Sequence, residues 1–187
     1  MPARARPYRR FIASTRAVAA VEFAIILPVL MVMFLGTFDA GRAITIYLKV
    51  RTATYTLAAV TNQYTTIQSS DMQAILGATS VILTPYSSSP VVVTVSQIKI
   101  SNNGSATVNW SASLNGTARS QGSSVSVPTA LASPNSYLIF AEVSYTYTPM
   151  FGYFTNAPIT LSDNLYATPR TSLCVLYPPQ NITASPC

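Results

Sequence analysis

The stretch that decides the fold is Arg16-Ala-Val-Ala-Ala-Val-Glu-Phe-Ala-Ile-Ile-Leu-Pro-Val-Leu-Met-Val-Met-Phe-Leu-Gly-Thr-Phe-Asp39. From residue 17 to residue 38 it is apolar except for Glu22, Gly36 and Thr37, and it holds no basic residue that could pair with Glu22. A run of roughly 20 such residues is long enough to cross a bilayer as a helix. A carboxylate in such a run costs about 2.5–3.5 kcal/mol at the bilayer centre and less near an end, so Glu22 is a candidate functional residue.

Positive charge is concentrated at the N-terminus of the 187-residue chain. Residues 1–16 hold five arginines and no acid, whereas the remainder is nearly balanced. A basic flank beside an apolar span is typical of the cytoplasmic side of a membrane anchor. We therefore expect the N-terminus inside and the C-terminal part outside. The remainder offers no distributed basic face, so no nucleic-acid partner is expected.

The apolar span is expected to be the first part of a longer helix, over residues 18–62, with residues 18–38 spanning the membrane. Residues 41–62 contain no proline. One continuous helix is favoured over two separate ones. Pro28 removes one backbone hydrogen bond, so local loosening is expected there. The residues that follow the three-to-four spacing of an amphipathic stripe are Ile44, Tyr47, Leu48, Arg51, Tyr55, Ala58 and Ala59.

Residues 63–187 are expected to form a β-rich head. A short helix capped by Ser70 is predicted over residues 69–77. Asn102-Asn103-Gly104, between two β-rich runs, is a strong hairpin signal. The predicted fold class is α+β, with the long N-terminal helix packed on a small antiparallel β-sheet. Runs of β-branched and aromatic residues that predict strands cover residues 79–84, 91–101, 105–113, 137–149 and 160–168.

Enzymatic and metal chemistry has little support in the sequence. The chain has no histidine, which excludes His-based triads and His metal sites. Its five acidic residues include no sequence-close pair suited to acid–base catalysis, and its seven glycines are scattered and form no phosphate loop. We expect neither enzymatic activity nor a metal or cofactor.

Two cysteines, Cys174 and Cys187, lie near the C-terminus. A location outside the cytoplasm would permit a disulfide between them, and this pairing is favoured over two free thiols. Closing so short a loop is worth on the order of 3 kcal/mol in the chain-entropy view.

Residues 20–28, Ala-Val-Glu-Phe-Ala-Ile-Ile-Leu-Pro, together with Asp39-Ala-Gly-Arg42, resemble the TadE family. These are minor pilins or pseudopilins of tight-adherence (Tad/Flp) type IV pilus systems. Residues 142–151 and 165–170 resemble later segments of the same family. The resemblance implies a structural protein whose partners are the major pilin, a sibling pseudopilin, a prepilin peptidase, the inner-membrane assembly platform and the lipid bilayer.

The resemblance also implies how the N-terminus is processed. In the family a prepilin peptidase removes the basic leader and leaves a glutamate at the fifth mature position, so here residues 1–17 are the leader and the cut falls between Ala17 and Val18. The family usually has glycine where this chain has Ala17. The new α-amine of Val18 would share a helix face with Glu22. Pairing of that amine with Glu22 of the next subunit would set the register, with Phe23 and Pro28 in the same assembly segment.

The resulting hypothesis is a minor pilin or pseudopilin, assembled into or at the tip of a Tad-type pilus, that supports pilus biogenesis and surface adherence. We expect a single-pass inner-membrane protein with a cytoplasmic N-terminus and a periplasmic head, which then reaches the pilus and the cell surface. The alternative is a monomeric, signal-anchored periplasmic binding or adhesion module in which Glu22 is incidental.

Overall fold

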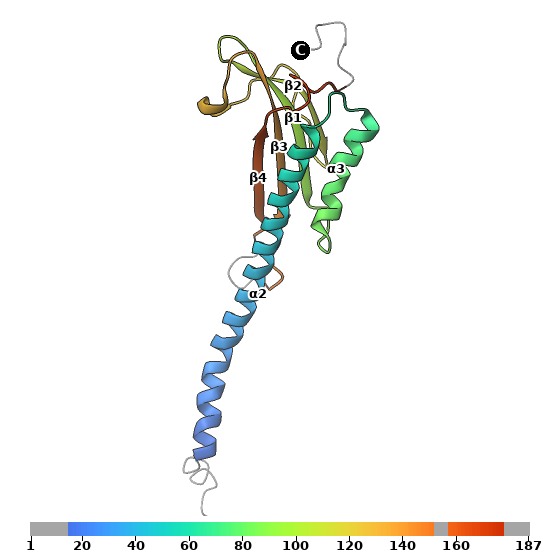
Figure 1. The fold of residues 1–187 in the computed structure, drawn as a ribbon. Helices are drawn as coiled ribbons and strands as arrows, with labels where there is room; N and C mark the ends of the chain where they lie inside the picture. The colour runs from blue at the N-terminus through green and yellow to red at the C-terminus, as the bar shows by residue number, and fades with distance from the viewer. Residues whose placement is uncertain (1–14, 152–156, 178–187) are drawn as a thin grey trace, which may run out of the picture. The chain divides into compact units, whose positions relative to one another are not determined.

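The fold is α+β, as the sequence predicted, in a computed structural model that describes residues 15–151 and 157–177 (Figure 1). Residues 1–14 of the predicted leader and Cys187 lie outside the described residues. In chain order the elements are α2 (Thr15–Thr61), α3 (Ser69–Leu83), β1 (Val91–Ile100), β2 (Ala106–Leu114), the short 3-10 helix η1 (Thr129–Leu131), β3 (Ser136–Tyr147) and β4 (Ile159–Ala167).

The chain divides into two compact units, and α2 contributes to both. The first unit comprises α2 up to Arg42 together with the segment Pro149–Ala157. The second contains the rest of α2, α3 and the sheet. The helix is unbroken at Pro28, which confirms the expectation of one long helix.

The second unit is built on a four-stranded antiparallel sheet with the order β2-β1-β3-β4. The predicted hairpin at Asn102-Asn103-Gly104 joins β1 to β2, and Gly104 adopts a φ of 80°, which glycine reaches without strain. The strands predicted over residues 91–101, 105–113 and 160–168 agree with β1, β2 and β4 to within two residues at each end.

The main core lies between one face of the sheet and the helices. The second half of α2 supplies Ile46, Val50 and Leu57, and α3 supplies Met72 and Ile75. Alternate side chains of the strands meet them, as expected for a strand period of two. These core-facing strand residues are Val91, Val93, Val95, Ile139, Ala141, Val143 and Tyr145.

A smaller core lies on the opposite, outer face of the sheet. It is formed by Ile98, Ile100, Val108, Leu138 and Phe140, and side chains of the segment between β2 and β3, among them Val125 and Val127, pack against it. This segment thereby covers one end of the outer face.

The predicted apolar stripe of α2 matches the side that packs only in part, because Ala58 is buried in the core but most of its other members are not. Ile44, Leu48 and Tyr55 are exposed, whereas Ile46, Val50, Ala53 and Leu57 face the core. Both sets fit the helical period, so spacing alone could not choose between them.

The prediction of a strand over residues 79–84 is also wrong, because α3 extends from Ser69 to Leu83. Buried Met72, Ile75, Thr79 and Leu83 continue a helical spacing straight through Gly77. The cap differs too. Gln68 is the N-cap in place of Ser70, and the Asp71 carboxylate accepts the Gln68 backbone N–H at 3.2 Å.

Candidate functional site

The apolar part of α2 is the largest candidate interaction surface. From Val18 to Phe34 its large apolar side chains are between 37% and 71% exposed. The helix is long and apolar enough to cross a membrane, and none of its most apolar window is buried. Monomeric soluble proteins rarely expose so much contiguous apolar surface, so lipid or another protein must cover it. The helix therefore fits a single-pass membrane anchor.

The residues predicted to act in assembly lie on this surface. Glu22, Phe23 and Pro28 are exposed, and Glu22 makes no hydrogen bond or ion pair with any residue that the structure describes. Val18, also exposed, lies four positions earlier in the helix. Thr37, another polar residue of the span, differs because its hydroxyl donates to its own helix, to the Met33 carbonyl at 2.8 Å. Of these two polar residues, Glu22 is thus the one without a partner among the residues that the structure describes.

The C-terminal end of the span holds a polar and aromatic contact that the sequence did not predict. The Asp39 carboxylate accepts the backbone N–H groups of Met150 and Phe151 at 3.2 and 3.1 Å. The rings of Phe38 and Phe151 meet edge to face, with centroids 6.0 Å apart. Arg42 lies over the Phe38 ring, and its Nη1 is 3.7 Å from the Met150 sulfur. The available signal was an acid placed directly after the apolar run.

The second half of α2 carries an exposed apolar stripe of its own. Ile44 is 61% exposed, Leu48 55% and Tyr55 64%, and Tyr47 lies beside them. Their spacing places them on one side of the helix, opposite the residues that pack on the sheet. Such a side is suited to packing against another helix.

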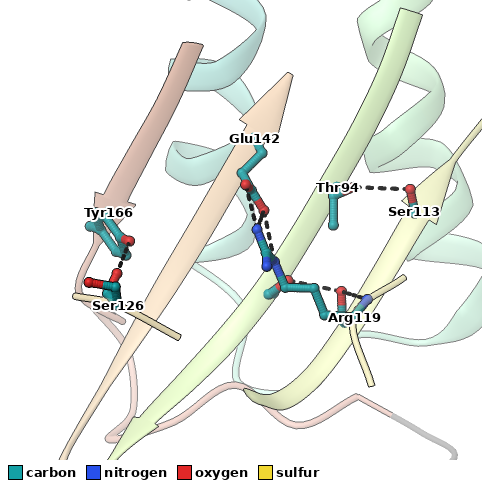
Figure 2. A network of polar contacts seen from close by, with 8 residues as sticks. Thr94, Ser113, Arg119, Ser126, Glu142 and Tyr166 are labelled. Atoms are coloured by element: carbon teal, nitrogen blue, oxygen red, sulfur yellow. Dashed lines mark hydrogen bonds and ion pairs between the residues drawn. The ribbon is translucent and has the colours of Figure 1, made fainter. Parts of the chain in front are cut away.

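The outer face of the sheet carries a polar network (Figure 2). The Arg119 guanidinium, from the segment after β2, donates to both carboxylate oxygens of Glu142 on β3 at 2.6 to 3.0 Å. The same guanidinium lies 5.5 Å from the centroid of the Phe140 ring. Phe140 in turn stacks on Tyr166 of β4, with centroids 4.3 Å apart. The Tyr166 hydroxyl donates to the Ser126 carbonyl at 3.2 Å.

This environment changes the acidity of Tyr166. Burial raises the pKa of its hydroxyl above the ordinary value of 10.0, and the negative charge of Glu142 raises it further. Arg119 acts in the opposite direction. Tyr166 is therefore a neutral hydrogen-bond donor at neutral pH and carries no charge into the network.

Beside the network lies a cavity of about 430 Å³. Polar side chains dominate its lining, and they include Thr94, Arg119, Glu142, Ser144, Ser162 and Asn164. The chain enters this region through Gly116, where an added Cβ would lie 2.5 Å from Cγ1 of Val92. Among the described residues no group of three or more His, Cys, Asp or Glu side chains could hold a metal ion.

Sequence reasoning missed Arg119 and the contacts of Asp39, and the reason is the same for both. Their partners are far away along the chain, at Glu142 and at residues 150–151, and no local pattern predicts such pairs. Cys174 is buried and is not a free thiol. Because Cys187 lies outside the described residues, the bridge between the two cysteines stays a prediction, and so does cleavage after Ala17.

Residues 17–59 match the family of TadE-like proteins. The match covers α2 almost completely and includes Glu22, Phe23, Pro28 and Asp39. No curated protein and no solved structure matches the chain.

Proposed function

We propose that the chain is a minor pilin or pseudopilin of a Tad-type pilus, starting from the match of residues 17–59 to the family of TadE-like proteins. It would be assembled into the fibre or at its tip, and it would support pilus biogenesis and surface adherence. The observation that carries the proposal is the exposed apolar helix with one exposed, unpartnered carboxylate among the described residues, at Glu22.

The physical argument concerns the partner of Glu22. An ionised carboxylate in an apolar environment is costly unless a cation pairs with it. Cleavage after Ala17 would create an α-amine at Val18, and in a helix residues four apart share a face. In a stack of subunits, the amine of one copy could reach Glu22 of its neighbour. The pairing would neutralise both charges and would fix the axial register of the helices.

The exposed stripe of Ile44, Leu48 and Tyr55 supports the same proposal. A monomeric anchored protein has no need of apolar side chains along the water-exposed side of a helix that already packs on its sheet. In a fibre these side chains would contact helices of the major pilin or of a sibling pseudopilin. The prepilin peptidase and the inner-membrane assembly platform are the other partners proposed from the family.

Recovery of the chain in fibres sheared from the cell surface tests the proposal. Glu22→Ala should insert in the membrane and accumulate normally but be absent from sheared fibres. Thr37→Ala is the matched control, because the Thr37 hydroxyl is satisfied within its own helix. It should be recovered in fibres like the parent. Equal recovery of Glu22→Ala and Thr37→Ala in fibres would contradict the register role.

A second candidate function is a monomeric anchored binding or adhesion module. The polar cavity of about 430 Å³ beside Arg119 and Glu142 favours it, because such a hollow can take a small polar ligand. The two functions predict different outcomes for the location and length of the chain and for the Glu22→Ala variant. The binding module would stay in the membrane fraction as a full-length monomer and would tolerate Glu22→Ala.

A further inference from the structure

The contacts at the end of the apolar span hold a loop segment at the level where a bilayer surface would lie. At 1.5 Å per residue, residues 18–38 form about 31 Å of helix, which matches a hydrocarbon core of about 30 Å. If this span crosses the bilayer, Phe38 lies at the hydrocarbon boundary. Asp39 and Arg42 then lie in the headgroup layer, where charged side chains remain hydrated.

Asp39 positions Met150 and Phe151 beside this boundary. Its carboxylate accepts both of their backbone N–H groups, and hydrogen bonds to an ionised acceptor are the stronger kind. The Phe151 ring contacts Phe38 but is not covered by it. Phe38 stays 47% exposed, Phe151 40% and Met150 61%. The result is a small apolar surface that continues the apolar surface of the span.

We propose that Met150 and Phe151 bind the bilayer interface, with their side chains inserted between the headgroups and the start of the acyl chains. This inference rests on the proposed role of residues 18–38 as the membrane anchor. Apolar and aromatic side chains are stabilised at this depth, and a neighbouring cation can interact with lipid phosphates. Arg42, whose Nη1 is 3.7 Å from the Met150 sulfur, places a cation at the same level.

Lipid is the occupant that these positions favour. The surface begins where the apolar run ends, so any membrane that covers Phe34 and Phe38 reaches Phe151 as well. The Asp39 carboxylate accepts from the backbone of Met150 and Phe151, whose side chains stay 61% and 40% exposed. Asp39 is thus a positioning residue, and Met150 and Phe151 are the binding residues.

Tryptophan fluorescence in vesicles with brominated lipids tests the depth of the loop. The full chain carrying Phe151→Trp is compared with the parent, whose only tryptophan is Trp110, in vesicles of phosphatidylcholine and phosphatidylglycerol. Bromine near the headgroups should quench the added emission more than bromine near the chain ends. Met150→Trp should show the same quenching pattern, which would exclude an effect specific to the Phe151→Trp substitution. Leu131→Trp, an exposed position of the second unit, should be quenched only by aqueous iodide.

Two further variants separate the possible failures. Phe34→Trp reports on the span itself and should be quenched by bromine near the chain ends. If Phe34→Trp is quenched while Phe151→Trp and Met150→Trp are reached only by iodide, the inference is wrong and the anchor stands. If none of the three is quenched by lipid, the anchor fails as well. Adding Asp39→Ala to Phe151→Trp should abolish the lipid quenching, and retained quenching would refute the positioning role of Asp39.

Discussion

Replacing Gln97 by leucine should destabilise the second unit by about 1–2 kcal/mol, because it removes a buried acceptor. The Gln97 side-chain oxygen accepts the Val175 backbone N–H at 2.8 Å and the Trp110 indole N–H at 3.1 Å. Gln97 and Val175 are fully buried. The indole keeps a second acceptor, the Val175 carbonyl at 2.7 Å, so one donor, the Val175 N–H, loses its partner.

The size of the destabilisation follows from the one donor that loses its partner, the Val175 N–H. One buried unpaired N–H costs about 1–3 kcal/mol. Part of this is recovered, because the side-chain amide nitrogen of Gln97 has no partner among the described residues and leucine removes it. The affected contact matters for the fold, since it ties the C-terminal segment to the central strand β1 and fixes Trp110 of β2.

Urea unfolding of the full chain in detergent, followed by Trp110 fluorescence, measures the effect. With an m-value of about 1–3 kcal/mol per molar for small proteins, the midpoint should fall by roughly 1 M. Gln73→Leu is the control, since it makes the same chemical change at an exposed position of α3 and should shift stability by less than about 0.5 kcal/mol. If Gln97→Leu unfolds at the parent's midpoint or above it, the reasoning about the buried donor is wrong.

Four other predictions concern the outer face of the sheet. Glu142→Gln should lower the pKa of Tyr166, because it removes a charge that raises it; NMR titration of the Tyr166 ring checks this, and an unchanged value would contradict it. Folding raises the pKa of Tyr166, so its contribution to the free energy of unfolding is fully present below pH 10.0 and is lost as the pH rises further. Tyr166→Phe should therefore flatten the alkaline decline in stability. Arg119→Met should cost less than about 1 kcal/mol in urea unfolding, as partly exposed ion pairs are weak, and a larger loss would show that the pair is structurally essential. Gly116→Ala should cost about 1–3 kcal/mol through overpacking, and adding Val92→Ala should restore part of it, which a double-mutant cycle detects.

The fold was predictable where the pattern is local and repeated. The apolar run, the alternation in β1 and the Asn102-Asn103-Gly104 turn each determine their own structure, and the long helix and antiparallel sheet follow from them. The prediction failed where two local solutions are equally good. The period of α2 allowed either of two sides to face the sheet, and packing chose the one with Val50 and Leu57.

The candidate site was predictable only in part, for a related reason. Glu22 stands out because a carboxylate in an apolar run violates a local rule. Arg119 is an ordinary loop residue and Asp39 an ordinary polar residue just after the apolar run of α2. Their roles come from partners about 111 residues away for Asp39 and 23 for Arg119, which only the folded chain brings together.

The mass of the chain recovered from sheared fibres tests the central claim most directly. If the exposed helix is an assembly element whose freed amine meets the carboxylate of a neighbouring copy, the fibre-borne chain begins at Val18. A chain found only in membranes, with Met1 still attached, would contradict the account.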